Sequence, residues 1–235
     1  MEVQGMKLVL DDVKATLGTW SFSAQGTFDE GLHLVCGDVG SGKSTLALMM
    51  AGLLPAASGS VTREQVSSLM VSFQFPEYHI TGTTVHDECK SWGLDPETIL
   101  SSISLGEKRD RDPLRLSRGE LKRLHLACVL ANPYDLLILD EPFSSLDVNE
   151  KQRICNTLSS RSKGITVLFT HEQAIFPRVA HIWEIREGRL WYCGSPPDGL
   201  WNWHYAPPLI RTLIAAGKTP KNISPEDLME AACMT

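Results

Sequence analysis

The sequence predicts an α/β fold in which a mostly parallel β-sheet carries helices on both faces. Residues 32–35 form an apolar, strand-like run that leads into a glycine-rich segment at 37–44, and a helix-length apolar stretch follows at 45–54. Residues 136–139 and 165–169 are apolar runs of the kind found in fully buried strands. Because parallel strands need long crossover connections, strands that alternate with helices indicate a parallel sheet.

Further strands are expected around this core. The N-terminal region predicts antiparallel β-structure, because strand-like pieces at 7–10 and 20–22 are separated by glycine-marked turns. A third piece at 68–73 predicts another strand. The alternation of apolar and polar residues at 182–193, interrupted by a Glu-Gly pair, predicts a β-hairpin.

Two helix signals lie in the middle of the chain. Asp95 precedes Pro96, which is typical of a capped helix start. Residues 116–130 place Leu121 and Leu124 on one helical face. We interpret residues 76–130 as a helical subdomain.

The composition changes near residue 200, where we place a domain boundary. Aromatic residues crowd at 201–205 and two prolines follow at 207–208. Ser224-Pro225 is a good helix start signal, so two helix-like pieces are expected after the prolines. The sequence thus predicts a main domain, residues 1–200, and a small C-terminal helical extension, residues 201–235.

Composition limits the class of protein. The chain has 235 residues, of which 43% are hydrophobic and 21% charged, so a folded globular protein is expected. The net charge of −6 and the pI of about 5.6 argue against the strongly basic face of a nucleic-acid-binding protein.

Cysteine usage and apolar runs indicate an intracellular protein without a membrane span. The six cysteines lack metal-ligand spacing, and we expect them to be reduced, buried side chains. Residues 1–4 are not followed by the apolar stretch of a secretion signal. The longest apolar run, residues 46–57, is shorter than the roughly 20 residues needed to cross a bilayer. Any membrane role is therefore expected to come through a partner.

The glycine-rich segment 37–44 carries the most specific chemical signal. It matches the phosphate-loop pattern G-x-x-x-x-G-K-[ST] at every fixed position. Backbone N–H groups freed by the glycines, together with the N-terminus of the next helix, favour a phosphate anion. Lys43 is expected to neutralise β- and γ-phosphate oxygens, and Ser44 to ligate Mg²⁺. The predicted nucleotide-binding residues of this segment are Gly37, Asp38, Val39, Gly40, Ser41, Gly42, Lys43, Ser44 and Thr45.

By itself this pattern predicts only that the chain binds a nucleoside triphosphate, because kinases and GTPases share it. The alternative, a glycine-rich turn that matches by chance, is disfavoured by the strand before it and the helix after it.

A pair of carboxylates follows the apolar run at 136–139. The C-terminal ends of parallel strands form the edge of the sheet at which ligands bind. Asp140 is therefore expected to hold Mg²⁺, and Glu141 to act as the general base on the attacking water. Two solvated carboxylates at a strand end are the alternative interpretation.

Four further motifs occur in the order found in ATP-binding cassette (ABC) ATPases. Residues 116–120, Leu-Ser-Arg-Gly-Glu, resemble the family's signature, commonly Leu-Ser-Gly-Gly-Gln. Gln74 is in the position of the Q-loop glutamine and Asp147 lies in a segment similar to the D-loop. His171 closes a strand as the switch histidine does. With the phosphate loop, this order identifies the chain as a member of the family and implies a P-loop ABC cassette fold.

The resemblance implies a mechanism that needs two chains. Two cassettes would pack head to tail with two ATP molecules between them, and Ser117 and Gly119 would contact the ATP held by the other chain. His171 would contact the γ-phosphate and orient the water, and Asp147 would connect the two sites. Gln74 would ligate Mg²⁺ and sense the reaction. The residues with a catalytic role are then Glu141, His171 and Gln74.

The sequence departs from the family pattern in three ways. Arg118 and Glu120 replace a glycine and the glutamine of the signature, which puts the hydrolysis rate in doubt more than the binding mode. The aromatic residue that usually stacks on adenine has no clear equivalent near residues 15–17; Trp20 is the nearest aromatic, and a core role suits it equally. The interval between Gln74 and residue 116 is shorter than usual, so the helical subdomain is expected to be shortened.

Two shorter matches indicate a subgroup. Residues 73–78 resemble the Q-loop of the ATPases of energy-coupling-factor transporters and of the related cobalt and nickel importers. Residues 207–211 and 223–228 resemble the C-terminal extension of the same group, where it helps the cassettes dimerise; a generic helical cap over the sheet is the alternative.

The leading hypothesis is therefore an ATP-hydrolysing subunit that powers a vitamin or metal-ion importer. It would work as a homo- or heterodimer on integral membrane subunits, at the cytoplasmic face of the cell membrane. Its ligands would be ATP and Mg²⁺, and no nucleic acid is expected.

Two alternatives remain open from the sequence. One is a soluble ABC ATPase acting in nucleic-acid repair or translation. The short interval after Gln74, the single phosphate loop and the acidic charge argue against it. The other is a low-turnover nucleotide-binding partner in a heterodimer, suggested by Arg118 and Glu120.

Overall fold

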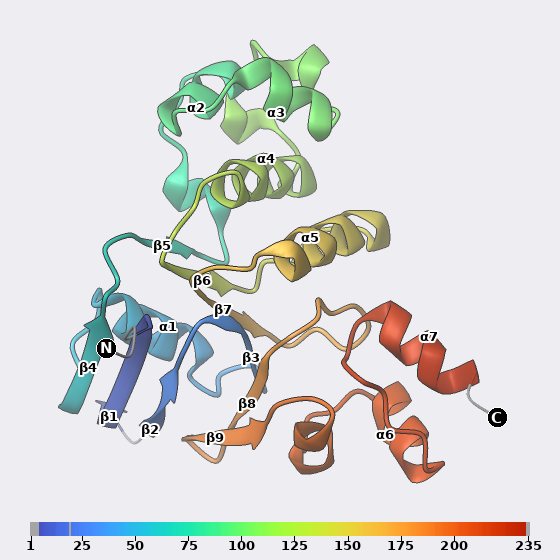
Figure 1. Cartoon of the computed structure of the whole chain (residues 1–235). Coiled ribbons are helices and arrows are strands. Elements are labelled where there is room, and N and C mark those ends of the chain that lie inside the picture. Colours follow the sequence, from blue (N-terminus) through green and yellow to red (C-terminus); the bar gives the residue numbers. More distant parts are fainter. Residues whose placement is uncertain (1–4, 19, 234–235) are drawn as a thin grey trace.

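The computed structural model describes residues 5–18 and 20–233, in which one sheet has the strand order β4-β1-β2-β9-β8-β3-β7-β6-β5 (Figure 1). Residues 1–4, on which the expectation about a secretion signal rests, lie outside this range. The strands are β1 (Lys7–Leu17), β2 (Trp20–Phe28), β3 (Gly31–Gly37), β4 (Ser58–Glu64), β5 (Leu69–Ser72), β6 (Leu136–Asp140), β7 (Ile165–Thr170), β8 (His181–Arg186) and β9 (Arg189–Gly194). The helices are α1 (Lys43–Ala51), α2 (Val85–Ser91), α3 (Pro96–Ser102), α4 (Arg118–Leu130), α5 (Val148–Ser160), α6 (Pro208–Ala215) and α7 (Pro225–Cys233).

The predicted parallel core is confirmed. Strands β8, β3, β7, β6 and β5 are all parallel neighbours. Residues 136–139 of β6 are fully buried. Burying one leucine side chain contributes about 1.5–3 kcal/mol, so this strand is a large part of the driving force for the core.

Alternate residues of β6 pack into different hydrophobic clusters. Leu137 and Leu139 belong to a cluster that also contains residues of α4, α5 and the C-terminal region. Leu136 and Ile138 belong to a cluster with α1, β1 and β2. Side chains of a strand alternate between faces, so helices cover both faces of the core, as the sequence predicts.

The antiparallel part is also confirmed, and it is longer than the sequence pieces indicate. Strand β1 pairs antiparallel with both β2 and β4, and its register shifts between Leu10 and Val13. β8 and β9 form the predicted hairpin. The β2–β9 connection is a single parallel pair, Ser23 with Arg189.

Helix α1 begins and ends at residues with special backbone conformations. The sequence pattern predicts that it extends to residue 54, but it ends at Ala51. Gly52 has φ 77°, a left-handed conformation that stops the helix, and its N–H group is bonded to Leu48 and Met49 carbonyls. The stop signal is thus the glycine, not the following Pro55.

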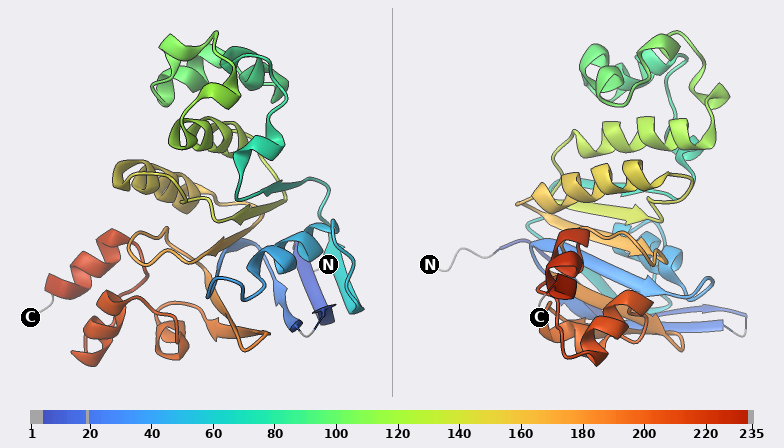
Figure 2. Two further views of the ribbon diagram at one scale, coloured as in Figure 1. Left: turned by 180° about the vertical axis from the view of Figure 1, so that it is seen from behind. Right: turned by 90° about the vertical axis from the view of Figure 1, so that its right-hand side faces the viewer.

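Helices α2 and α3, in the segment predicted to be a helical subdomain, lie on the side of α4 that is away from the sheet (Figures 1 and 2). Helices α2, α3 and α4 share a hydrophobic cluster that includes Val85, Leu100 and Leu121. Asp95 caps α3 as predicted, by accepting a hydrogen bond from the Thr98 N–H group. Helix α4 also packs on the sheet, because Leu126 belongs to the cluster around β6.

Residues after 200 pack against the central sheet. Trp203, Ile210 and Leu228 are buried in the same cluster as Leu137 of the central sheet. The two expected helix-like pieces are α6 and α7, at the opposite end of the molecule from α2 and α3 (Figure 2). The boundary near residue 200 stays a prediction.

Five of the six cysteines are buried, as predicted. Cys36, Cys89, Cys128, Cys155 and Cys193 are buried and unpaired. The sixth, Cys233, is exposed, which the sequence did not lead us to expect. None of the helices in the described ranges is both long and apolar enough to cross a lipid bilayer.

Candidate nucleotide site

The phosphate-loop segment connects the end of β3 to the start of α1 and depends on glycine for its shape. Gly40 and Gly42 have φ 81° and 108°, in the left-handed region that favours glycine. A Cβ atom at Gly42 would lie 2.7 Å from the ring of Trp20. A Cβ atom at Gly37 would lie 2.9 Å from the Ile185 carbonyl oxygen. A side chain is therefore excluded by backbone conformation at Gly40, by neighbouring atoms at Gly37 and by both at Gly42.

The ammonium group of Lys43 is almost buried inside this loop. Its Nζ atom donates hydrogen bonds to the carbonyl oxygens of Gly37 and Asp38, at 2.8 and 3.0 Å. It also lies 3.6 Å from Oε1 of Glu141, in a pair whose side chains are both less than a tenth exposed. A buried cation without a full counter-charge favours an anion beside it.

Both predicted carboxylates stand at the end of β6. Asp140 and Glu141 are 5% and 7% exposed. Glu141 has φ 48°, a rare conformation for a residue with a side chain, and such strain is often found at functional sites. Burial raises the pKa of Asp140, opposed by a hydrogen bond from Ser44. Its Oδ1 atom is buried without a hydrogen-bond partner.

The carboxylate of Glu141 is held by groups at the end of β7. It accepts hydrogen bonds from the Thr170 hydroxyl at 3.2 Å and from the His171 backbone N–H at 3.3 Å. His171 Nδ1 lies 2.7 Å from its other oxygen. β6 and β7 are paired neighbours, which explains how residues 30 positions apart meet.

Lys43, Glu141 and His171 open onto one cavity of about 440 Å³, whereas Asp140 is absent from its lining. It is lined by Trp20, Val39, Gly40, Gly42, Lys43, Ser44, Thr45, Gln74, Glu141 and His171. The structure thus brings Gln74, Glu141 and His171 to the phosphate loop, as the motif order predicts. Asp38 instead meets Tyr205, and the hydroxyl of Ser41 is buried beneath Gly37.

Besides Gly37, Asp38 and Ser41 of the loop, the three residues predicted to act between two chains are absent from the lining of this cavity. Ser117 caps α4, and Gly119 lies in its first turn against the Ser145 carbonyl. Asp147 caps α5 by accepting from the Glu150 N–H at 2.9 Å. Their role in the site of a second chain stays a prediction.

Glu120 is turned away from the position expected of a phosphate ligand. It accepts from the Ser117 N–H at 3.1 Å, which completes a capping box, and it pairs with Lys108. The hydrogen bond from Lys108 is the main cause of its lowered pKa. The unfavourable contact between this carboxylate and a triphosphate is therefore avoided in this conformation.

Two residues near the site were not assigned a role from the sequence. Trp20 lines the cavity, and its only sequence signal is its aromatic ring ahead of the loop. Lys122 is 1% exposed and donates a hydrogen bond to the Gln74 carbonyl at 2.8 Å. Burial lowers the pKa of Lys122 to about 8. The sequence pattern does not indicate that this lysine is buried.

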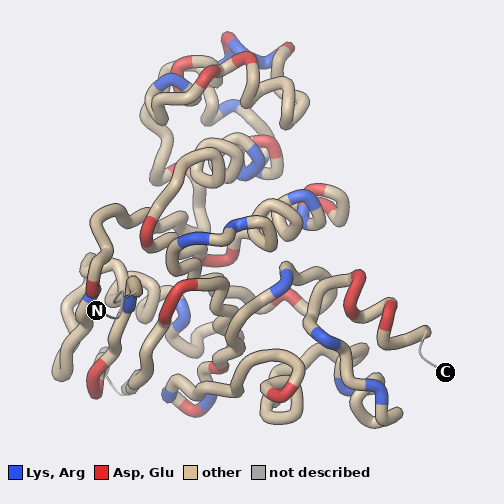
Figure 3. Tube along the Cα trace, viewed as in Figure 1, with Lys and Arg blue, Asp and Glu red and all other residues tan. Residues whose placement is uncertain are grey.

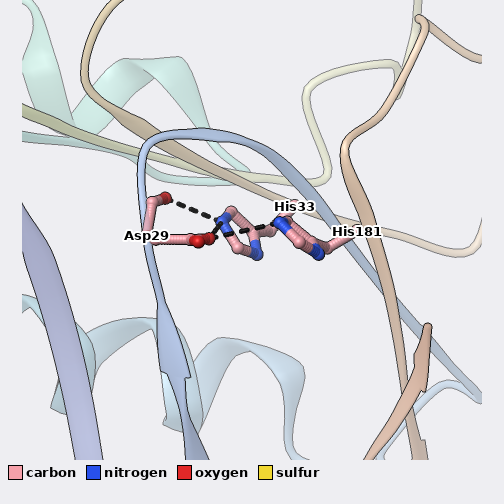
Figure 4. A group of neighbouring side chains, drawn as sticks. All are labelled: Asp29, His33 and His181. Carbon is pink, nitrogen blue, oxygen red and sulfur yellow. Dashed lines mark hydrogen bonds and ion pairs between the residues drawn. The ribbon is translucent and has the colours of Figure 1, made fainter. Parts of the chain in front are cut away.

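Asp29, His33 and His181 form a separate group (Figure 4), and none of the three lines the cavity. Nδ1 of the fully buried His33 accepts a hydrogen bond from the Trp183 indole N–H at 3.1 Å. Its Nε2 atom must then carry the proton and donate to the Asp29 carbonyl at 2.9 Å. Neither nitrogen has a lone pair for a metal ion, so we interpret the group as a hydrogen-bonded core element.

The fold and the cavity together define a nucleoside triphosphatase with a phosphate-binding loop. The chain belongs to the ABC transporter family, whose sequence profile matches residues 26–144. It is an ATPase of that family, and the predicted family and P-loop fold are confirmed.

Similar proteins agree with this assignment. The energy-coupling factor transporter ATP-binding protein EcfA1 of Fusobacterium nucleatum is 32% identical to this chain, over 83% of this chain and 85% of the relative. EcfA1 of Thermotoga maritima is 33% identical to this chain, over 78% of this chain and 82% of the relative. A bacterial Atm1-family ABC exporter with ATP bound has the same fold, with a TM-score of 0.68 at 21% identity. The alignment covers 87% of this chain but only 42% of the exporter chain.

Proposed function

We propose that this chain is the ATP-hydrolysing subunit of an importer of the energy-coupling-factor type, for a vitamin or for cobalt or nickel. The observation that carries the proposal is the similarity over most of both chains to ATP-binding proteins of energy-coupling factor transporters. The Gln74 segment supports it, because Phe75 and Tyr78 next to Gln74 are 54% and 75% exposed. Exposed aromatic side chains of this kind suit contact with another protein.

The site supports a division of roles for hydrolysis. Backbone N–H groups of residues 37–45 and the ammonium of Lys43 bind the phosphates. Glu141 takes the proton of the attacking water, and His171, held to Glu141, orients that water. The ring of Trp20 offers a surface on which the nucleobase stacks.

The residues at the loop also fit Mg²⁺. The unpartnered buried oxygen of Asp140 and the adjacent Ser44 hydroxyl are the hard oxygen ligands that this ion prefers. Gln74, on the cavity wall, completes the protein ligands. When bound, the ion neutralises charge on the phosphate oxygens.

A second cassette completes the site in this proposal. Ser117 and Gly119 sit at the start of α4 and Asp147 at the start of α5, outside their own chain's cavity. The hydroxyl of a capping serine accepts one hydrogen bond from its helix and still has a proton to donate. These residues therefore suit the γ-phosphate of an ATP bound by the other chain.

Charge distribution argues against a nucleic acid as the partner. Acidic and basic residues are mixed along α4 and α5 (Figure 3). Arg123 pairs with Glu150, and Lys151 with Glu172. Basic side chains that are neutralised in this way do not form a phosphate-binding stripe.

The proposal is tested by isolating the full chain with its membrane partners from detergent extracts. We expect integral membrane proteins to co-purify in fixed ratio and to stimulate ATP hydrolysis. The double variant Phe75→Ser/Tyr78→Ser should lose them and keep ATP binding, while Trp201→Ser, an exposed aromatic at a distance, should keep them. An isolated chain stimulated by DNA or ribosomes instead would overturn the proposal.

A further inference from the structure

The C-terminal extension contacts the phosphate loop directly. The hydroxyl of Tyr205 donates a hydrogen bond to Oδ2 of Asp38 at 2.8 Å. The Asp38 carbonyl oxygen accepts from Lys43 Nζ at 3.0 Å and from the Ser41 N–H at 3.1 Å. Asp38 is therefore held on one side by the loop and on the other by residue 205. Burial and the Asp38 carboxylate raise the pKa of Tyr205 to about 12, so the phenol keeps its donated proton at neutral pH.

A buried carboxylate fixes the segment that carries Tyr205. Glu184 is 1% exposed and accepts hydrogen bonds from the backbone N–H groups of His204 and Tyr205, at 2.9 and 3.3 Å. Glu184 stands beside Cys36 in the β3–β8 ladder, one residue before the loop begins at Gly37. The extension is thus anchored to the sheet at the strand position that leads into the loop.

The same extension holds the chain that follows His171. The side chain of Asn222 accepts from the N–H of Val179 and donates to its carbonyl, both at 2.9 Å. Arg178 and Asp227 form an ion pair at 3.3 Å. The C-terminal extension therefore contacts the phosphate loop through Tyr205 and the segment that follows His171 through Asn222.

We propose that Tyr205 is a positioning residue for ATP binding, which holds the phosphate loop in its binding conformation through Asp38. This inference rests on the proposed phosphate-binding role of residues 37–44. A loop held before the ligand arrives loses less conformational freedom on binding, so the hydrogen bond strengthens ATP affinity without taking part in the chemistry.

The test compares Tyr205→Phe with the unaltered full chain, using a non-hydrolysable ATP analogue and steady-state hydrolysis. We expect about a threefold loss of analogue affinity and a matching rise in KM, with kcat and thermal stability little changed. The matched control is Tyr192→Phe, which removes a phenol bonded to His181 and Ser195 and should bind the analogue normally.

A double-mutant cycle decides whether the effect passes through Asp38. In the Asp38→Ala background, Tyr205→Phe should cause no further change in affinity. An equal loss in both backgrounds, or no loss in either, overturns the inference.

The variant Lys43→Ala distinguishes a failure of this inference from a failure of the proposed phosphate-binding site. If Lys43→Ala leaves analogue binding intact, the loop itself is misassigned; if it abolishes binding while Tyr205→Phe has no effect, only the inference on Tyr205 is wrong.

Discussion

Nδ1 of His171 lies 2.7 Å from Oε1 of Glu141, and the same oxygen lies 3.6 Å from the ammonium of Lys43. The carboxylate that is placed to act as the base is thus paired with two groups that also face the cavity. A triphosphate bound in the loop would compete with Glu141 for the ammonium group of Lys43. The Glu141 carboxylate would then interact with His171 and with water. The arrangement predicts that removing the charge of Glu141 affects turnover more than binding.

Glu141→Gln should reduce the turnover of ATP by about 100-fold or more, because the amide cannot accept the proton of the attacking water. Affinity for ATP should be kept or increased, since the change leaves Lys43 in place. Phosphate release and equilibrium nucleotide binding measure the two effects. Glu187→Gln, at the turn of the β8–β9 hairpin, is the control. Equal hydrolysis by Glu141→Gln and the unaltered chain would show that the base is another group.

Glu120→Gln should leave ATP turnover within about threefold of its original value. Glu120 completes the capping box of α4 and pairs with Lys108, and glutamine also serves in a capping box. Glu120→Ala removes one half of the capping box and the ion pair with Lys108, and should cost about 1 kcal/mol of unfolding free energy. Chemical denaturation and hydrolysis assays check both. A large gain in turnover with Glu120→Gln would mean that this carboxylate faces the phosphates in the working dimer.

Trp20→Ala should weaken ATP binding by about tenfold, as expected for loss of one aromatic–base stack. Binding of inorganic tripolyphosphate should not change, because it has no base to stack on Trp20. Trp20→Phe should keep most of the ATP affinity, and Trp191→Ala, on the hairpin, serves as the control. If ATP and tripolyphosphate lose affinity equally, Trp20 supports the loop at Gly42 rather than the base.

Protein stability should fall as the pH drops below 6.5. Burial lowers the pKa of His33 to about 4, whereas the unfolded chain has a value near 6.5. The unfolded state therefore takes up a proton first, so the contribution of His33 is complete above pH 6.5 and is lost between pH 6.5 and 4. From pH 7.5 to 5 this amounts to about 2 kcal/mol.

Urea unfolding of the unaltered chain and of His33→Gln at these two pH values isolates the effect from that of other groups. His125, whose pKa burial also lowers, acts in the same direction in both proteins. Between pH 7.5 and 5, the unfolding free energy of His33→Gln should fall by about 2 kcal/mol less than that of the unaltered chain. An identical dependence in both would mean that His33 does not stay neutral in the folded state.

Most of the fold was predictable because its signals are local. The runs at 136–139 and 165–169 are apolar throughout, and buried parallel strands have this composition. Helix α1 ends at Ala51 although the apolar run continues to residue 54, because Gly52 adopts a left-handed conformation that stops the helix.

The resemblance to the family gave Glu141 and His171 their separate roles. The direct contact between these two side chains could not be predicted from the sequence. The exposed Cys233 and the buried Lys122 have no signature in a single sequence, because burial depends on which element packs over a residue. The same reason explains why Trp20 could be assigned equally to the core or to the nucleotide.

The sequence by itself determined the chemistry of the loop at residues 37–44, since glycine conformations, the lysine and the helix start all lie within a few residues. Only the tertiary structure decided what surrounds that loop. Tyr205 reaches Asp38 across 167 positions, and Glu141 meets His171 across 30. Contacts of this kind depend on strand order and register, which join distant segments and which no short pattern encodes.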